Sequence, residues 1–341
     1  MADQHHTQRR RVAAAVATVG AVTLGGCGDN AQNSLHAQSP QAHDIAALWW
    51  WMLGVASLVF FGAIAMLVVG WLRRRDRGLP LVGEDETAND RLVITFGIAI
   101  PVVILVTLFL VANVAVIGAT AAPKPSSTKL TIQVVGHDWW WEVRYPGHTA
   151  VTANEIHIPT RTRVDVLGTT DDVIHSLWVP ELNRKIDLIP GRVYRVLLYA
   201  DHAGIYRGQC AEFCGLQHAH MSLYVVADDP PQFAAWLRRQ AAPAAAPASP
   251  AAARGRRLFL ATSCSGCHAI RGTSARSDIG PDLTHVASRM SLAALTIGNS
   301  SSDLLRWISD PQHIKPGARM PALNLSAPNF AAIAAYLRSL R

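Results

Sequence analysis

Two long stretches without a charged side chain set the first limit on how this chain can fold. Residues 45–72 and 92–118 are almost entirely apolar and contain no Asp, Glu, Lys or Arg. Roughly 20 apolar residues in a helix cross the bilayer core, and a buried helix of a soluble protein would keep a polar stripe that neither stretch has. The sequence therefore predicts two transmembrane helices, the second of them kinked at Pro101.

The arginines between these stretches predict the orientation of the chain. Arg73, Arg74, Arg75 and Arg77 directly follow the first stretch. Basic residues concentrate in the cytoplasmic loops of membrane proteins. The loop is therefore predicted to be cytoplasmic, which places both chain ends, and everything after residue 118, on the extracytoplasmic side.

The N-terminus has the features of an export signal. Three arginines, Arg9–Arg11, precede the short apolar run AAAVATVGAVTLGG and then Cys27. This order is typical of a signal peptide, here residues 1–26. LGGC also resembles the bacterial lipoprotein signal, in which the cysteine becomes a lipidated new N-terminus. An uncleaved anchor is the alternative, but the run is short for a span. We expect lipid on Cys27 and a location in the bacterial cytoplasmic (inner) membrane, with the later domains on its periplasmic side.

Patterning divides the rest of the chain into units. Segments such as LTIQVV, EIHIP and SLYVVA alternate in strand fashion between turn residues and predict an antiparallel β-sandwich or barrel. The Ala/Pro run QAAPAAAPASPAAA cannot bury a core and predicts a linker. The predicted units are an N-terminal segment with the two spans (27–125), the β-domain (126–228), a short helix with the linker (229–253, the run itself at 240–253), and a last unit (254–341) with helices near 254–262, 301–309 and 328–340.

Charge is distributed unequally between the two extracytoplasmic units. Residues 254–341 carry 11 basic and 4 acidic side chains, whereas residues 126–228 carry 9 and 11, within a formal net charge of +7 for the whole chain. An exported membrane protein rarely meets nucleic acid, so we exclude a nucleic-acid partner despite the basic balance. Opposite charges instead favour docking of the two units on each other, and the basic last unit predicts a donor protein with an acidic face.

The motif CSGCH at residues 264–268 predicts a covalently bound haem. C-x-x-C-H is the attachment signature of c-type haem, with Cys264 and Cys267 forming thioethers and His268 facing the iron. The alternatives are a redox dithiol and half of a zinc site. Zinc would need a second ligand pair, and this unit has no other cysteine.

A methionine is the expected sixth ligand of that haem, and two lie downstream. Met320 sits in KPGARMPAL, where prolines hold a loop, whereas Met290 sits near a helical pattern in which methionine usually fills a core. The order of helix, CxxCH, Pro-flanked Met loop and helix resembles class I cytochromes c. We therefore predict Met320.

The stretch CAEFCGLQHAHM, residues 210–221, predicts a copper site. Thiolate and imidazole ligands suit copper, and one cysteine more than a single copper requires suggests two coppers sharing two thiolates. Cys210, Cys214, His218 and Met221 come from this stretch. A second histidine must come from elsewhere, and His175 in DDVIHSLWVP lies at the end of a predicted strand 35 residues earlier.

A disulfide or a zinc site would explain these residues less well than copper. A disulfide between Cys210 and Cys214 would leave the His and Met unexplained, and Met is a poor zinc ligand. His220 would point away from Met221 in an extended segment, so a role at the surface or in support of the ligands is the interpretation for it. The same ordinary role is assigned to four further histidines: His137, His148, His157 and His202.

Together these motifs resemble subunit II of haem–copper cytochrome c oxidases over nearly the whole chain. C-x-E-x-C-x3-H-x2-M after two spans, DVIHSLWVP, KIDLIPGR and GHDWWWEVRYP all match, and the added haem unit resembles the caa3-type branch. The resemblance implies a multidomain membrane protein: a two-helix transmembrane hairpin, a cupredoxin-like β-sandwich holding the dinuclear CuA centre, and an all-α class I cytochrome c domain. It implies that CuA is held by His175, Cys210, Glu212, Cys214, His218 and Met221.

The resemblance also implies roles outside the copper ligands. Glu212 would bind copper through its backbone carbonyl, and its carboxylate would approach a magnesium ion bordering subunit I. Trp139 occupies the position at which the family accepts electrons from cytochrome c, whereas Trp140 and Trp141 have ordinary packing as their alternative. Many relatives carry a Glu shortly before the proline of the second helix. RLVITFGIAIP has none, so no proton-path residue is assigned.

The function implied is that of the subunit through which electrons enter a terminal oxidase. Electrons would pass from cytochrome c or another donor through haem c and CuA to the haem–copper subunit I, which reduces O2; subunit III is a further expected partner, as is membrane lipid. No residue pattern in this chain supplies the oxygen site itself. A CuA-containing nitric oxide reductase subunit and a copper-carrier or sensor lipoprotein are the alternatives.

Overall fold

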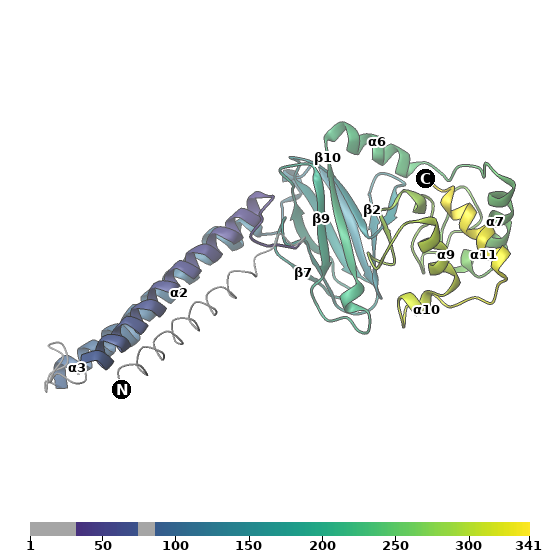
Figure 1. Cartoon of the computed structure of the whole chain (residues 1–341). Coiled ribbons are helices and arrows are strands. Elements are labelled where there is room, and N and C mark those ends of the chain that lie inside the picture. Colours follow the sequence, from purple (N-terminus) through teal and green to yellow (C-terminus); the bar gives the residue numbers. More distant parts are fainter. Residues whose placement is uncertain (1–31, 74–85) are drawn as a thin grey trace, which may run out of the picture.

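The computed structural model describes residues 32–73 and 86–341. The signal peptide predicted at 1–26 and Cys27 lie outside these residues, as does most of the arginine loop. Three parts follow one another along the described chain: a long helical hairpin, a β-sandwich and a helical C-terminal part (Figure 1). We call residues 126–228 the sandwich domain and residues 250–341 the C-terminal domain.

The hairpin consists of two helices long and apolar enough to span a membrane. They cover Pro40–Leu72 (33 residues) and Asp90–Thr120 (31 residues). In both helices the most apolar stretch is not buried against the rest of the described chain. Large side chains such as Trp51, Leu58 and Phe61 are exposed along the first, as expected of helices that bury their surface in lipid or in partner subunits. The elements are α2 (Pro40–Arg73), α3 (Glu86–Ile94), η1 (Thr95–Ala99), α4 (Ile100–Val111), η2 (Ala112–Ile117) and α5 (Gly118–Thr120).

Pro101 is accommodated by a wider helical turn. The turn η1 is π-helical, and the Ile100 N–H donates to the carbonyl of Thr95, five residues back. Proline has no N–H to donate, and its ring clashes with the carbonyl four residues before it. A π turn at this point relieves that clash while the helix continues into α4.

The sandwich domain is built from two five-stranded sheets. Their strand orders are β3-β2-β1-β5-β8 and β4-β10-β9-β6-β7. Between them lies an apolar core that includes Ile132, Trp141, Ile156 and Leu223. The strands are β1 (Leu130–His137), β2 (Trp140–Arg144), β3 (Val151–Ala153), β4 (Glu155–Pro159), β5 (Val164–Thr170), β6 (His175–Trp178), β7 (Ile186–Leu188), β8 (Tyr194–Leu198), β9 (Gly204–Cys210) and β10 (Ser222–Asp228).

The expected β-sandwich is confirmed, but its strands are not all antiparallel. β1 pairs with β5 in parallel, and β10 pairs with β4 in parallel, although the remaining pairs are antiparallel. Alternating side chains predict strands and their buried faces, but both pairings present the same alternation. Strand direction depends on where the chain returns to the sheet, which the pattern does not record.

The C-terminal domain is helical, with a two-residue antiparallel pair. Its first and last long helices, α7 (Pro250–Ala261) and α11 (Ala327–Arg338), cross closely. A Cβ on Gly255 would lie 1.9 Å from the carbonyl oxygen of Ala332, so the crossing requires glycine at 255. Phe259 and Tyr336 pack edge to face beside it, with ring centroids 6.1 Å apart. The other elements are α8 (Cys264–Cys267), η5 (Val286–Ser288), β11 (Ser291–Leu292), β12 (Ile297–Gly298), α9 (Ser301–Ser309), α10 (Pro311–Ile314), and, before the domain, α6 (Pro230–Ala241).

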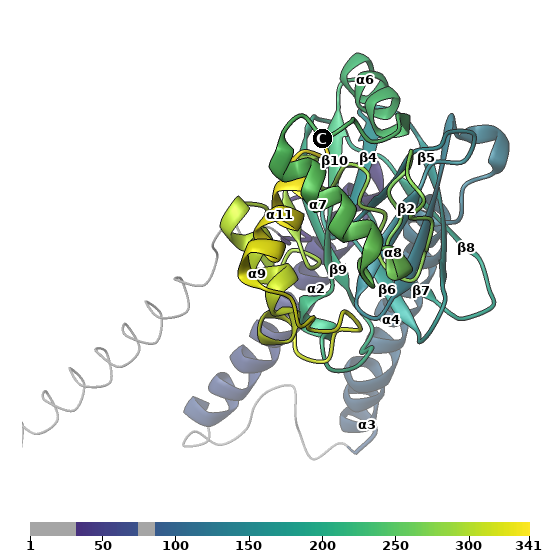
Figure 2. The ribbon, with the colours of Figure 1, turned by 90° about the vertical axis from the view of Figure 1, so that its right-hand side faces the viewer.

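The connection between the two domains is held in place by hydrogen bonds. The predicted linker, 240–253, already contains the end of α6 and the start of α7. Arg271 donates hydrogen bonds to the carbonyls of Gln240 and Ala242, and His285 donates to Ala242 as well. The C-terminal domain lies against the sandwich (Figure 2), and Arg271 also reaches the carbonyl of Thr149 there. The run therefore does not act as a flexible tether in this structure.

Candidate copper and haem sites

Two neighbouring strands bring the predicted copper ligands together. β9 ends at Cys210, the loop that follows carries Cys214 and His218, and Met221 directly precedes β10. β6 starts at His175 and pairs antiparallel with β9, with Leu177 opposite Cys210. His175 therefore lies at the base of the loop although it is 35 residues away in sequence.

The ligand atoms of this cluster lie within a few ångströms of one another. Cys210 Sγ is 3.7 Å from Cys214 Sγ, 3.9 Å from His175 Nδ1 and 3.2 Å from the carbonyl oxygen of Glu212. Cys214 Sγ is 3.6 Å from His218 Nδ1 and 3.8 Å from Met221 Sδ. Both sulfurs belong to free thiols, since a disulfide would hold them at about 2.05 Å.

This donor set fits copper. It offers two thiols, two imidazole nitrogens, a thioether and a carbonyl, of which the thiols and thioether select soft metals. Three of these side chains have ligand atoms that all lie within 4.8 Å of one another: His175, Cys210 and Cys214. Cys210, Cys214 and Met221 are buried, so a bound metal would be shielded from water and rigidly held.

Asp172 fixes the orientation of the His175 ring. Its carboxylate accepts a hydrogen bond from Nε2 at 2.8 Å. Burial is the largest single cause and disfavours charge on both groups, but this bond together with the neighbouring hydrogen bonds and charges outweighs it. The pKa of His175 is therefore raised to about 9 and the pKa of Asp172 is lowered to about 2. Because Nε2 is engaged, Nδ1 is the nitrogen left to face Cys210 and a metal.

The two thiols form a hydrogen-bonded pair. The hydrogen bond between them lowers the pKa of Cys210 and raises the pKa of Cys214. The raised pKa keeps the Cys214 thiol protonated. Metal binding displaces such protons, because the thiolate is the ligand.

Three consecutive tryptophans have three different positions. The Trp139 indole N–H donates to the carbonyl of Cys214 at 2.8 Å, and Gly215 leaves room for its ring. Trp140 stacks on His137, with centroids 4.4 Å apart. Trp141 is fully buried and its indole N–H reaches the carbonyl of Met221. The first tryptophan is thus the one in direct contact with the copper loop from the side of the C-terminal domain.

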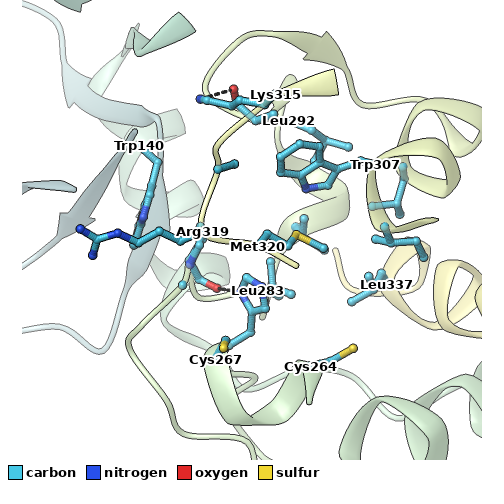
Figure 3. A pocket seen from close by; sticks show the side chains of 18 of the residues that line it. Trp140, Cys264, Cys267, Leu283, Leu292, Trp307, Lys315, Arg319, Met320 and Leu337 are labelled. Atoms are coloured by element: carbon cyan, nitrogen blue, oxygen red, sulfur yellow. Dashed lines mark hydrogen bonds between the residues drawn. The ribbon is translucent and has the colours of Figure 1, made fainter. Parts of the chain in front are cut away.

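A cavity in the C-terminal domain contains the predicted haem ligands. Cys264, Cys267, His268 and Met320 all line it, together with apolar side chains such as Leu337. Met320 points into the space that the two cysteines border from the other side (Figure 3). Met290 is not part of this lining. It is 38% exposed, and its backbone N–H donates to Glu155 of the sandwich domain.

His268 is held in the orientation that an axial ligand needs. Its Nδ1 donates to the carbonyl of Pro281 at 2.8 Å, which leaves Nε2 for the cavity. Gly280 packs directly on the ring, where a Cβ would come within 2.7 Å of His268 Cε1. Burial lowers the pKa of His268, so the ring is neutral and able to bind a metal.

Unsatisfied polar atoms at the cavity wall support a haem rather than an apolar void. Three residues that line it each have a buried polar atom without a hydrogen-bond partner in the described chain: Asp138 Oδ1, Arg289 Nε and Ser291 Oγ. Native interiors rarely leave such groups unpaired. Haem carries two carboxylate side chains, which are natural acceptors for the arginine and the serine. The cavity and its donors therefore fit the group.

The sandwich domain supplies part of the cavity wall, which the sequence did not predict. His137, Asp138, Trp139, Trp140 and Asn154 all face it. His137, expected either at the surface or beside the ligands, is one of the residues of this wall. No local motif marks these residues, since they follow from how two separately patterned domains meet.

Two families match separate parts of the chain. The family described as cytochrome C oxidase subunit II, periplasmic domain, matches residues 148–228, and the family described as cytochrome c matches residues 252–341. Cytochrome c oxidase subunit 2 of Alkalihalophilus pseudofirmus is 33% identical over 336 residues, 93% of this chain and 94% of that protein. The chain belongs to the cytochrome c oxidase subunit 2 family.

Other members of the subunit 2 family are also similar. Cytochrome c oxidase subunit 2 of Bacillus subtilis is 28% identical over 297 residues, 82% of each chain. The crystal structure of the periplasmic domain of subunit II of cytochrome oxidase from Bradyrhizobium japonicum is 30% identical, covering 36% of this chain and all of that one with a TM-score of 0.33.

Family membership establishes the general role. The chain is a subunit of a haem–copper oxidase, an oxidoreductase of the membrane, and it is the subunit through which electrons enter. Its two apolar helices and periplasmic-type domain agree with that role. A subunit 2 with a cytochrome c domain implies both copper and haem, and the oxidase relatives favour this role over the nitric oxide reductase and copper-carrier alternatives.

Matched histidine variants test the copper ligands. We expect His218→Ala to lower copper content by at least half, because His218 Nδ1 lies 3.6 Å from Cys214 Sγ. His220→Ala is the control, because its Nδ1 instead contacts Gln217 at 2.6 Å and the side chain is exposed. Copper is measured by elemental analysis of the purified chain. Equal copper in both variants would contradict the ligand set.

Proposed function

We propose that electrons from a donor protein are accepted by the C-terminal domain and pass through the sandwich domain to the oxidase core. The observation that carries the proposal is the shared wall of the haem cavity: Trp139 borders that cavity while its indole N–H bonds the carbonyl of Cys214. A single side chain thus touches both sites. When bound, the haem and the copper pair supply one-electron chemistry.

We propose the following ligands. The copper pair is held by His175, Cys210, the carbonyl of Glu212, Cys214, His218 and Met221. The haem is bound covalently by Cys264 and Cys267 and axially by His268 and Met320. Burial of the sulfur ligands supports the first set, because rigid ligands rearrange little when the charge changes. The shared cavity lining supports the second.

Other assignments of the proposed function depend on partners and on residues outside the described chain. The Glu212 carboxylate is proposed to face magnesium at the border with subunit I, since its carbonyl is turned toward Cys210. Subunit III is a further proposed partner, the inner membrane the proposed location, and Cys27 the proposed lipid attachment. Exposed arginines on the C-terminal domain, among them Arg257 and Arg276, support a donor with an acidic face.

Flash reduction tests the proposed route. We expect reduction of the copper centre after the haem to be first order and independent of protein concentration, because the two domains are already in contact. Raising the salt should slow this step by less than about twofold, whereas supply from an external donor should fall far more steeply, since only the exposed encounter is screened. A rate of copper reduction proportional to protein concentration would mean that the domains react between molecules.

A further inference from the structure

A lysine of the C-terminal domain is buried at the interface with the sandwich domain. Lys315 is 3% exposed. Its Nζ donates to the carbonyls of Trp139 and His220 at 2.8 Å each. A third bond, of 3.0 Å, goes to Ala293 in its own domain. An ammonium has three N–H donors, so every donor finds an acceptor. Of these acceptors, His220 lies in the copper loop and Trp139 packs against that loop.

An arginine four residues later makes a second attachment. Arg319 Nη2 lies 3.0 Å from Asp138 Oδ2 and 3.6 Å from Asp172 Oδ2. Asp172 in turn holds His175 and accepts the backbone N–H of Asp138 at 2.7 Å. The residue after Arg319 is Met320. Arg319 is therefore next to the proposed haem ligand Met320 in the chain, and it contacts Asp172, which bonds the proposed copper ligand His175.

The residues between these two attachments also lie on the copper loop. Gln217 Nε2 donates to the carbonyl of Pro316 at 2.7 Å. Gly317 has φ +81°, and a Cβ there would come within 2.7 Å of Leu216 Cδ2. One short segment thus contacts the sandwich domain at four residues: Lys315, Pro316, Gly317 and Arg319.

We propose that the segment 315–320 is a clamp that holds the C-terminal domain on the Trp139 face of the sandwich domain and closes this face to any external donor protein. The proposal rests on the proposed function for the role of Trp139. With the clamp in place, the Trp139 backbone is bonded to Lys315, its ring lines the cavity, and the carboxylates beside it are paired with Arg319. Because Asp138 and Asp172 are paired with Arg319, they are not free to attract a basic donor, and an external donor is left with the C-terminal domain as its docking surface.

Hydrogen–deuterium exchange on the metal-loaded full chain tests the clamp. The variants are Lys315→Met, Arg319→Gln and both together. Arg306→Gln is the matched control, because Arg306 is an exposed arginine of α9 that pairs with Asp303 in the same helix. The peptides that report on the sandwich side are 136–141 and 215–221.

We expect the double variant to exchange these sandwich peptides at least about tenfold faster, because a local opening exposes their backbone. The control should exchange at the wild-type rate. Loosening of residues 311–321 alone would show a role confined to the C-terminal domain and would overturn the clamp. Exchange does not depend on electron transfer, so a failed electron route and a failed clamp are distinguishable.

Binding of mitochondrial cytochrome c, a small basic electron carrier, tests the closed face. At low salt we expect the double variant to bind it at least about tenfold more tightly than the wild type, because Asp138 and Asp172 are released. Adding Asp138→Asn to the double variant should remove most of that gain. Equal affinity of the wild type and the double variant would overturn the claim that the clamp closes this face.

Discussion

Cys214→Ser is expected to abolish the dinuclear copper centre and leave the haem untouched. Cys214 Sγ lies within 3.8 Å of three other proposed ligand atoms, those of Cys210, His218 and Met221, so its removal takes away the atom that all three face. A serine hydroxyl is a hard ligand that copper accepts poorly. Loss of a residue that only orients a metal ligand typically lowers metal affinity or activity by about 10–100-fold. Loss of this ligand itself should therefore lower turnover of the assembled oxidase by at least about 100-fold.

Electron paramagnetic resonance and elemental analysis measure this outcome. The wild type should contain two coppers per chain with the unpaired electron shared between them when oxidised. A wild-type signal confined to one copper would contradict the dinuclear centre. Cys267→Ser is the reciprocal control: it should disrupt haem attachment and keep the copper, because the two domains have separate apolar cores.

The clustering of the proposed copper ligands could be predicted because most of these residues belong to one loop. Cys210, Cys214, His218 and Met221 fall within twelve residues, so their spacing nearly determines their geometry. His175 is remote in sequence, yet strand pairing between β6 and β9 brings it to the loop. Local spacing and one strand contact were therefore enough for this site.

The interface between the domains could not be predicted in the same way. In the sequence, Lys315 is one of 11 basic residues of the last unit, and Arg319 is the residue before Met320. Nothing in the pattern around either residue marks a contact with the other domain. Their partners are backbone carbonyls and carboxylates of another domain. A carbonyl is present at every position, so sequence carries no sign of which one will accept a buried ammonium.

Charge counts predicted that the two domains dock on each other, but not which residues make the contacts. The prediction used opposite net charges and a free tether of Ala and Pro. In the structure the run is fixed by Arg271 and His285, which bond its backbone carbonyl at Ala242. Composition describes the side chains of such a run, and the contacts are made by its backbone.

Met320→Ala is expected to lower the midpoint potential of the haem by at least about 100 mV, because a methionine axial ligand raises the potential and ligand identity tunes it over ≈ 0.8 V. The thioethers at Cys264 and Cys267 should keep the haem attached. Redox titration of the full chain measures the shift. Met290→Ala is the matched control, since Met290 lies outside the cavity lining and is partly exposed.

The backbone around Met320 should stay in place when the side chain is removed. Gln312 Nε2 donates to the carbonyls of Ala318 and Met320 at 2.7 and 2.8 Å, and Arg319 is paired with Asp138. None of these bonds uses the methionine side chain. A fall in potential would therefore report loss of a ligand rather than collapse of the loop. A potential that falls with Met290→Ala and not with Met320→Ala would instead assign the ligand to Met290, against the geometry of the cavity.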